Sequence, residues 1–350
     1  MKRRHFLRNG LLALGAPAVL PSGAGADVFL TSRQRRQVGG PIKLSSNENP
    51  LGIPIASREA IVGGIGEGNR YPGASRRALQ EAVAQAHGVP GNSIVLGNGS
   101  TEVLQMAVQA MLDPHLRLVA PAPTFEDVFE YSEPHPWIDL KPIPLLPDYS
   151  HDLTAMEEAT QGARGPVLVY VCNPNNPTGS LTSVGEVEAW IKRAPEGVQF
   201  LVDEAYFEFV DSDSYRSLDR LAVELPNVVV ARTFSKIHSL AGLRVGYAVM
   251  PEVLARALDK IREPFNVNML AQAAAYHSLG EEAEIARRAR ENAEVRDKVT
   301  EVLRELGSDV VPSEANFVYV RTLKPREVFE GLLDEGVIVR DFGTAPALRI

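Results

Sequence analysis

Short apolar runs alternate with amphipathic stretches between residues 94 and 250. The apolar runs are rich in β-branched residues and are bounded by turn-forming residues, which is typical of buried strands in a largely parallel sheet. They occupy residues 94–97, 116–120, 167–171, 200–204, 227–233 and 243–250. Apolar positions recur with helical spacing at 101–112 and 183–192. This alternation of strand and helix predicts an α/β sandwich.

After Pro251 the pattern becomes mainly helical and predicts a second, smaller α+β domain. The expected helices span 251–262, 268–279, 282–306 and 325–335, with strands at 317–320 and 337–340. A proline-rich loop is expected near 134–147. The predicted division of the chain is an export signal at 1–26, a segment joining the small domain at 27–60, a large domain at 61–260 and a small domain at 261–350.

The first 26 residues have the composition of an export signal. Lys2, Arg3, Arg4 and Arg8 precede the apolar run LLALGAPAVL, and Ala24-Gly25-Ala26 has the form of a cleavage site. Arg3-Arg4-His5-Phe6-Leu7 is similar to a twin-arginine signal. We therefore expect export to the periplasm by the twin-arginine route. The alternatives are a chance basic start before an ordinary secretory signal and a loose tail on a cytoplasmic protein. No later stretch approaches the roughly 18 apolar residues that span a membrane, so no membrane association is expected after signal removal.

Composition narrows the classes of partner. The 350 residues are 45% hydrophobic and 23% charged, with a net charge of −8. Both signs are spread along the chain, so nothing suggests nucleic-acid binding and small molecules are the expected partners. Cys172 is the only cysteine, which excludes an intramolecular disulfide. It lies in a valine-rich strand without an activating base nearby in the sequence, so we expect a buried thiol.

Two ionisable residues stand at predicted strand ends, where side chains of a parallel sheet face one cleft. Lys236 closes Thr233-Phe234-Ser235-Lys236, and Asp203 ends the strand before Glu204. A partly desolvated lysine has a lowered pKa and attacks carbonyl carbon. The alternatives are a solvated surface lysine and, for Asp203, a helix cap or a site role for Glu204 instead. Arg244 follows eight residues after Lys236, between glycines that permit close backbone approach to a phosphate.

Three further side chains accompany them. Tyr206 is a candidate donor, although a lone tyrosine is more often part of the core. The loop Cys172–Gly179, CNPNNPTG, follows a strand, and Asn176 is its best candidate for a binding role; the alternative is an ordinary turn. Phe125 is a candidate to stack on a planar ring, and the alternative is again a core position.

Gly97-Asn98-Gly99-Ser100-Thr101 opens a predicted helix, and free N–H groups at a helix start bind phosphate. A dinucleotide site is the rival interpretation, but Glu102 breaks the G-x-G-x-x-G spacing. A lysine, a carboxylate for a ring nitrogen, donors for a phenolate oxygen and a phosphate cradle are together the groups that pyridoxal phosphate requires. No metal site is expected.

With these segments in place, the chain resembles the fold type I pyridoxal-phosphate-dependent aminotransferases of class I/II, and it is most similar to the histidinol-phosphate aminotransferase family. The similarity runs from Leu44 to Ile350. It rests on NENPLG at 47–52, Tyr71-Pro72, the loop at 172–179, DEAY at 203–206 and RTFSKIHSLAGLRVG at 232–246. The resemblance implies a three-layer, aspartate-aminotransferase-like sandwich with a mostly parallel sheet, plus a smaller α+β domain.

The resemblance also implies roles for the residues. Lys236 would carry the cofactor as a Schiff base and shuttle protons, Asp203 would face the pyridine nitrogen, and Asn176 and Tyr206 the phenolate oxygen. Phe125 would stack on the ring. The phosphate would be held by Gly99, Ser100, Thr101, Thr233, Ser235 and Arg244. Tyr71 matches a tyrosine that completes the phosphate site of a second subunit, so a homodimer is expected.

For the substrate, the resemblance assigns Arg349 to the α-carboxylate and Arg340 to a substrate phosphate, with Asn47 and Asn49 also at the substrate. The loop between the two arginines looks short, and Asp341-Phe342-Gly343 departs from the family pattern. The family continues past Leu348-Arg349-Ile350 into another strand and helix, so we expect the sequence to be part of a longer chain.

The expected function is amino transfer from an amino acid, or an amine such as histidinol phosphate, to a 2-oxo acid. A lyase or decarboxylase on the same scaffold is one alternative, since fold does not fix reaction type. A non-catalytic protein that binds pyridoxal phosphate is the other. Histidine biosynthesis is cytoplasmic, which conflicts with the export signal and favours a different amino donor outside the cytoplasm.

Overall fold

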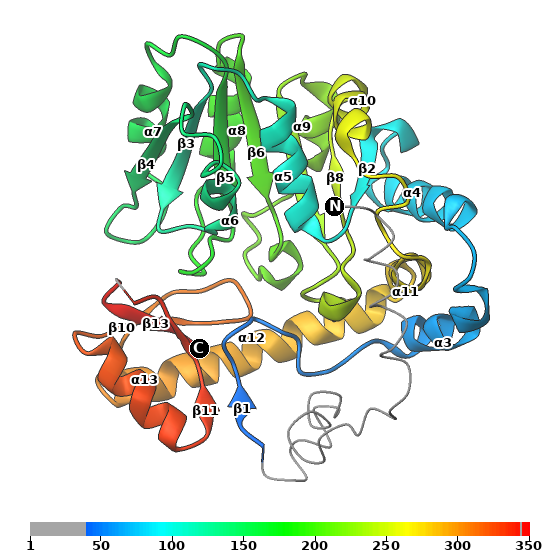
Figure 1. The fold of residues 1–350 in the computed structure, drawn as a ribbon. Helices are drawn as coiled ribbons and strands as arrows, with labels where there is room; N and C mark the ends of the chain where they lie inside the picture. Colours follow the sequence, from blue (N-terminus) through cyan, green and yellow to red (C-terminus); the bar gives the residue numbers. More distant parts are fainter. Residues whose placement is uncertain (1–39, 344) are drawn as a thin grey trace, which may run out of the picture.

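The computed structural model describes residues 40–343 and 345–350 (Figure 1). The predicted export signal and the first part of the predicted joining segment lie outside the described residues. Among the described residues, no helix is both long and apolar enough to cross a membrane.

A seven-stranded sheet in the order β2-β8-β7-β6-β5-β3-β4 forms the centre of the large unit. From β7 to β4 the neighbouring strands are parallel, whereas β8 runs antiparallel to both β2 and β7. The predicted α/β class with a mostly parallel sheet is therefore confirmed. The strands are β2 (Ile94–Gly97), β3 (Arg117–Ala122), β4 (Asp139–Pro144), β5 (Val167–Cys172), β6 (Val198–Asp203), β7 (Val228–Thr233) and β8 (Gly246–Val249).

Helices cover both faces of this sheet and make three layers (Figure 1). The helices up to residue 279 are α3 (Ile55–Gly64), α4 (Gly73–His87), α5 (Ser100–Ala110), α6 (Asp127–Glu130), α7 (Leu153–Thr160), α8 (Val184–Arg193), α9 (Asp219–Glu224), α10 (Glu252–Ile261) and α11 (Met269–Leu279). Of these, α3 packs mainly against α11 and not on the sheet. Short 3-10 turns span Ile65–Glu67, Gly91–Ser93, Phe207–Phe209 and Ala241–Leu243.

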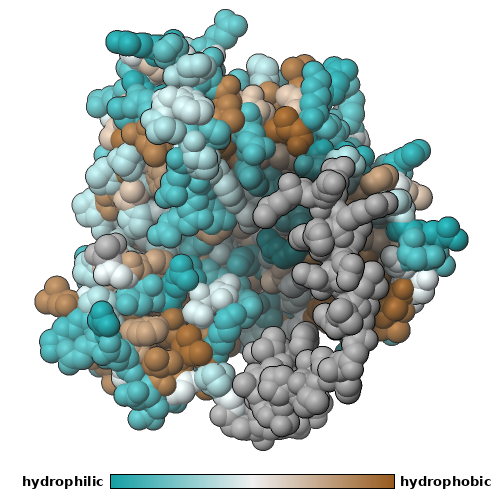
Figure 2. Space-filling view, in the orientation of Figure 1, coloured by the Kyte–Doolittle hydropathy of each residue, from teal (hydrophilic) through white to brown (hydrophobic). Residues whose placement is uncertain are grey.

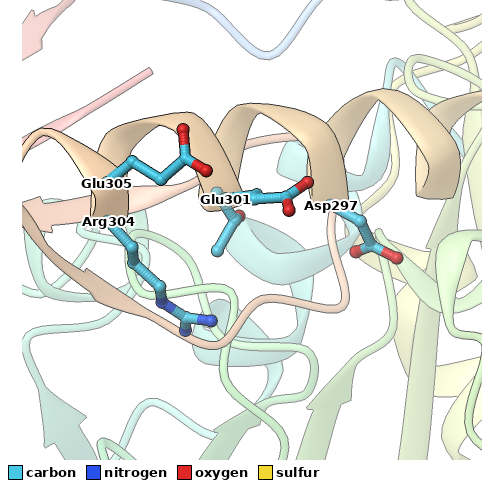
Figure 3. A pocket seen from close by; sticks show the side chains of 5 residues that line it. Asp297, Glu301, Arg304 and Glu305 are labelled. Atoms are coloured by element: carbon cyan, nitrogen blue, oxygen red, sulfur yellow. The ribbon is translucent and has the colours of Figure 1, made fainter.

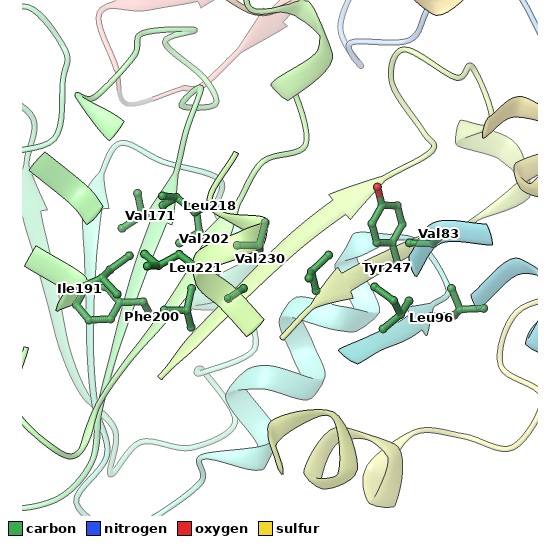
Figure 4. Packing of buried hydrophobic residues seen from close by; sticks show 14 of the residues in the cluster. Val83, Leu96, Val171, Ile191, Phe200, Val202, Leu218, Leu221, Val230 and Tyr247 are labelled. Atoms are coloured by element: carbon green, nitrogen blue, oxygen red, sulfur yellow. The ribbon is translucent and has the colours of Figure 1, made fainter. Parts of the chain in front are cut away.

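The core divides at the sheet because successive strand residues point to opposite faces. In β6, Phe200 packs on one side with Trp190 of α8, while Leu201 packs on the other with Tyr170 of β5. Figure 4 shows the first of these clusters, in which Phe200 and Ile191 meet. Trp190 and Phe200 lie edge to face with ring centroids 5.0 Å apart. Buried apolar residues on both faces thus hold the parallel strands between helices.

The prediction of a loop throughout 134–147 was wrong, because β4 lies within it. This strand pairs parallel with β3 at the edge of the sheet. Its residues alternate between half-buried and exposed, as an edge strand requires. Prolines at 142 and 144 suggested a loop, but an edge strand tolerates them because one side of its backbone has no partner strand.

The smaller unit contains an antiparallel sheet in the order β12-β13-β10-β9, with two helices beside it. Its strands are β9 (Asp309–Val311), β10 (Tyr319–Arg321), β12 (Arg340–Asp341) and β13 (Ala347–Arg349), and its helices are α12 (Glu282–Glu305) and α13 (Pro325–Asp334). Near the start of the described chain, β1 (Ile42–Lys43) pairs parallel with β11 (Val337–Ile338). The N-terminal segment therefore contacts the small unit, and the division at residue 260 stays a prediction.

Sheet register brings the chemical groups together. Cys172 and Asp203 are Cα partners at the carboxyl ends of β5 and β6, and Thr233 ends β7 alongside them. Lys236 follows three residues beyond Thr233. From the small unit, β13 presents Arg349 toward the same region, since it lines the same cavity as these strand ends.

Candidate active site

One cavity of about 430 Å³ lies between the carboxyl edge of the large sheet and the small unit. Most residues that the sequence assigned to the site line it. These are Asn47, Ser100, Thr101, Phe125, Asn176, Asp203, Tyr206, Thr233, Ser235, Lys236, Arg244, Arg340 and Arg349. Residues near the start and near the end of the described sequence, such as Asn47 and Arg349, therefore line the same cavity.

Lys236 is set in a largely desolvated position. Its Nζ donates to the carbonyl oxygen of Ser46 at 3.4 Å and lies 5.5 Å from the centre of the Tyr206 ring. Burial, and then the positive charge of Arg349, lower the pKa of Lys236 to about 8, while the Asp203 carboxylate acts in the opposite direction. A larger fraction of this amine is therefore neutral near pH 7 than for an exposed lysine.

Asp203 is a buried carboxylate with fixed orientation. Its Oδ2 accepts a hydrogen bond from the Tyr170 hydroxyl at 3.0 Å, and its Oδ1 accepts one from the Ala205 N–H at 3.1 Å. Burial raises the pKa of Asp203 to about 6 in spite of these bonds. The group is thus an anion that gains from a cation placed in the cavity.

Tyr206 reaches the cavity from the turn after β6. Its hydroxyl oxygen accepts a hydrogen bond from Asn47 Nδ2 at 2.9 Å, and burial raises the pKa of Tyr206. The phenol therefore stays protonated and keeps its own O–H to donate. Asn47 itself has a φ of +53° and is 5% exposed, and its Oδ1 has no hydrogen-bond partner among the described residues.

The start of α5 and the loop around Arg244 form a cradle for an anion. Gly99 precedes the helix with a φ of +80°, and a Cβ on it would collide with the Arg244 guanidinium. Arg244 donates from Nη1 to the Ala241 carbonyl at 3.0 Å and to Ser235 Oγ at 3.4 Å. Thr233 Oγ1 accepts from the Ser235 N–H at 3.1 Å. Free helix N–H groups beside a guanidinium fit a phosphate.

Arg349 is tied into the opposite wall. Its Nη1 donates to Asn176 Oδ1 at 2.7 Å and its Nη2 to the Ser45 carbonyl at 2.8 Å. Its Nε has no partner among the described residues. The Asn176 oxygen is used in this bond, so its amide N–H groups remain to donate into the cavity. Arg340 is the Cα partner of Arg349 across β12 and β13.

Three assigned residues are not in the cavity lining. Asn49 donates from Nδ2 to the Ile237 carbonyl at 3.1 Å and accepts from the Leu51 N–H at 3.0 Å, so both ends of its amide are used by backbone. It supports the loop after Lys236. Gly99 lies behind Ser100 and acts through its lack of a side chain. Tyr71 is 82% exposed and stacks on Phe265 with ring centroids 4.8 Å apart.

Several cavity residues were not found from the sequence. Glu126, Asp127 and Glu130 follow Phe125 and line the cavity, as do Glu48 and Phe342. Their only signal was proximity in sequence to an assigned residue. Tyr170 donates its hydroxyl hydrogen to Asp203, but in the sequence it is only one of several apolar residues in a predicted buried strand.

A second hollow lies on the surface of α12. It is open and lined by Asp297, Thr300, Glu301, Arg304 and Glu305, most of them exposed (Figure 3). None of the residues assigned from the sequence lies there. No group of three or more histidine, cysteine or acidic residues suited to a metal ion was found in the described part of the chain.

The large cavity has what pyridoxal phosphate requires: a phosphate cradle, a buried anion for the ring nitrogen, a protonated phenol and a lysine of lowered pKa. The fold and this cavity define an enzyme that uses that cofactor. Residues 40–350 match the family model described as aminotransferase class I and II. The chain belongs to the class I and II aminotransferases.

Relatives of known name agree with this. The histidinol-phosphate aminotransferase of Moorella thermoacetica is 39% identical over 315 residues, covering 88% of this chain and 80% of that protein. The enzyme of that name from Bacillus subtilis is 37% identical over 313 residues, covering 88% and 86%. The protein is thus a pyridoxal-phosphate-dependent aminotransferase acting on small-molecule amino donors and oxo acids.

Solved structures confirm the fold. Histidinol-phosphate aminotransferase from Sinorhizobium meliloti, in complex with pyridoxal-5'-phosphate, superposes with a TM-score of 0.83 at 26% identity and covers 95% of this chain and 93% of that one. L-Threonine-O-3-phosphate decarboxylase from Porphyromonas gingivalis shares the fold at a TM-score of 0.74, covering 88% of this chain and 93% of that one. At 23% identity it shows the fold alone, so the lyase alternative gains no support.

Proposed function

We propose that this enzyme transfers the amino group of an amino acid to a 2-oxo acid in the cavity around Lys236. Asp203 would hold the cofactor's ring nitrogen, Tyr206 and Asn176 its phenolate oxygen, and Phe125 its ring face. The start of α5, with Thr233, Ser235 and Arg244, would hold its phosphate. When bound, pyridoxal phosphate supplies an electron-withdrawing ring that stabilises charge at the donor's α-carbon.

Lys236 would hold the cofactor covalently and would move the proton at the donor's α-carbon. Its pKa of about 8 supports this role, because a group that takes and returns a proton works best when its pKa is near the operating pH. The Asp203 charge lies near enough to act on the lysine pKa, so the anion for the ring and the amine share one small volume. The neutral Tyr206 phenol provides a fixed O–H beside them.

The observation that carries the proposal is the position of Arg349. Asn176 and Ser45 fix its guanidinium in the cavity wall, and its charge acts on the pKa of Lys236. A fixed, planar guanidinium suits a planar carboxylate and orients the bond at the α-carbon. We propose an α-amino acid as donor on this basis, although the named relatives are histidinol-phosphate aminotransferases.

A donor panel tests this function. The purified holoenzyme is incubated with single amino acids or histidinol phosphate plus pyruvate, a 2-oxo acid with one carboxylate, and 2-oxo products, CO2 and ammonia are measured. Amino acids should yield 2-oxo products, and K236A should abolish the reaction while K192A, a change at an exposed position of α8, should not. A marked kinetic preference for histidinol phosphate, or release of CO2 or ammonia without 2-oxo product, contradicts the proposal.

We also propose a homodimer in which Tyr71 completes the phosphate site of the partner. Support comes from the exposed apolar side chains of α3 and its continuation, where Ile55 and Val62 are 64% and 66% exposed and Ile65 lies beside them. Figure 2 shows apolar atoms at the right-hand edge, where Figure 1 places α3. Light scattering should give the mass of two chains, and Y71F should weaken cofactor affinity without changing that mass. A monomer that binds the cofactor tightly would contradict this proposal.

Export through the twin-arginine route is proposed from the N-terminal sequence, which lies outside the described residues. Replacing Arg3 and Arg4 by lysine should retain the protein in the cytoplasm, because that route requires the arginine pair. Cell fractionation and the mass of the mature chain measure the outcome. Equal distribution of both forms would remove the support for export.

A further inference from the structure

Three carboxylates on one side of the cavity have no part in the proposed reaction. Glu126, Asp127 and Glu130 lie in or just before α6, directly after Phe125, and all three line the cavity. Asp127 is half-buried and accepts a hydrogen bond from the Tyr131 hydroxyl at 3.1 Å. Glu126 and Glu130 are exposed, and their carboxylates form no ion pair or hydrogen bond with the described residues.

The opposite wall of the cavity is positive. Arg340 and Arg349 are cross-strand partners and both line it. The charge of Glu126 raises the pKa of Arg349, which burial and Arg340 lower. Glu126 and Arg349 are therefore near enough to interact, yet they do not form an ion pair. Their charges face the same space and are available to a ligand that carries both signs.

The remaining charges of the cavity already have roles or partners. Asp203, Arg244, Arg349 and Lys236 take part in the proposed reaction, and Glu48 pairs with Lys43 at 3.1 Å. Among the lining residues without such a role or partner, the charges left to compare are the three carboxylates of α6 and its start and the one guanidinium of Arg340. The potential beside α6 is therefore negative and favours a cation there.

A separate observation points to a ligand with N–H groups. Asn47 lines the cavity and is 95% buried, and its Oδ1 has no partner among the described residues. Its Nδ2 is already used in the bond to Tyr206. A buried acceptor without a donor is costly, so a ligand that donates an N–H to Asn47 Oδ1 removes this cost.

We propose that Glu126 determines donor specificity and selects amino acids whose side chain ends in a cation, such as an ammonium or guanidinium group. The proposal rests on the proposed function, because Arg349 holds the donor's carboxylate at the other end. A dicarboxylic donor, or one with a phosphate, places a second anion beside α6 and is disfavoured.

Three donors of similar length but different charge test this selection in the holoenzyme: lysine, norleucine and 2-aminoadipate. In the wild type, kcat/KM should fall in that order. E126Q should lower kcat/KM for lysine by about 3- to 10-fold, the range of a partly screened charge pair, and leave norleucine within about twofold. E133Q is the matched control, because Glu133 is an exposed carboxylate nearby in sequence that does not line the cavity.

Binding is measured separately from turnover with carboxylates that have no α-amino group. The inhibition constants, or direct titration of the holoenzyme, compare 4-guanidinobutanoate, hexanoate and adipate. The guanidino compound should bind most tightly to the wild type, and E126Q should remove most of its advantage over hexanoate. Raising the salt concentration should reduce that advantage in the wild type, since the interaction is screened.

The outcomes separate this proposal from the proposed function. Equal or preferred use of 2-aminoadipate by the wild type, or identical profiles for E126Q and E133Q, overturns the role of Glu126 while amino transfer stands. Absence of amino transfer from every donor overturns the proposed function. In that case the binding of 4-guanidinobutanoate, hexanoate and adipate still shows whether the cavity selects a cation beside Glu126.

Discussion

Arg349 and Asn176 are 173 positions apart in sequence, yet Arg349 Nη1 donates to Asn176 Oδ1 across 2.7 Å. One comes from β13 of the small unit and the other from the loop after β5 of the large sheet. The bond therefore connects the proposed carboxylate-binding group to the loop proposed to face the cofactor. It also orients the Asn176 amide, because an oxygen used by Arg349 leaves the N–H groups on the cavity side.

Arg349→Lys should lower kcat/KM for amino acid donors by about 100-fold, mainly through KM. Lysine cannot keep bonds to Asn176 and Ser45 while offering two parallel N–H groups to a carboxylate, and loss of a charge-assisted pair costs about 1.5–3 kcal/mol. Steady-state kinetics measure the effect. Arg321→Lys on neighbouring β10 is the control, since Arg321 is exposed and pairs with Asp309. Similar losses in both variants would contradict the assignment of Arg349.

The pKa of Lys236 predicts the pH dependence of cofactor attachment to the apoenzyme. Only the neutral amine reacts, so the rate should rise with pH and reach half its maximum near pH 8, well below the ordinary lysine value of 10.5. Arg349→Met should move this midpoint upward, because the charge of Arg349 contributes to the lowered pKa. The absorbance of the bound cofactor follows the rate. A wild-type midpoint near 10.5 would show that the amine is not desolvated.

Asp203→Asn should inactivate the enzyme and stabilise the apoprotein. Burial raises the pKa of Asp203 from 3.8 to about 6, so folding becomes less favourable as the pH rises from 3.8 through 6. The amide does not ionise, and the variant should gain up to about 3 kcal/mol of unfolding free energy at pH 7. The gain should vanish below about pH 3.8, where the carboxyl is protonated in both states. Urea unfolding at several pH values measures it, with exposed Asp297→Asn as the control.

Strand ends explain why part of the site was predictable. Asp203 and Lys236 follow apolar runs that could only be buried strands, and parallel strands bring their carboxyl ends to one edge. Tyr170 was not found, because a tyrosine in an apolar strand shows nothing of the carboxylate it will meet on the next strand. Asn49 was assigned to the substrate, but the folded loop uses its amide to bind the backbone at Ile237 and Leu51.

Most strands of the large sheet were predictable from the sequence, whereas one edge strand and two helices were not. The pattern predicted the strands of the sheet from β2 to β8, except β4, whose prolines are compatible with an edge position that only the sheet order reveals. The helices α3 and α4 were not predicted, and both pack against α11, about 200 residues later in the chain. The contacts with α11 join segments far apart in the sequence, so the pattern of either segment alone does not show them. The helix α4 itself has a local signal, since Leu79 and Val83 are buried at helical spacing and Gly88 ends it. The position of the acidic residues of α6 in the cavity wall was not predicted either, because it also depends on how distant segments pack.

Gly99→Ala should reduce cofactor affinity by about tenfold or more while the chain still folds. A Cβ at this position would collide with the Arg244 guanidinium, and a φ of +80° is unfavourable for alanine, at a cost of roughly 1–3 kcal/mol. Arg244 must then move away from the start of α5, which separates the two halves of the proposed phosphate cradle. Fluorescence titration of the apoenzyme with pyridoxal phosphate measures the affinity. Gly242→Ala is the matched control, because a Cβ there would meet nothing within 4 Å. Equal affinities for the two variants would mean that the phosphate is bound elsewhere.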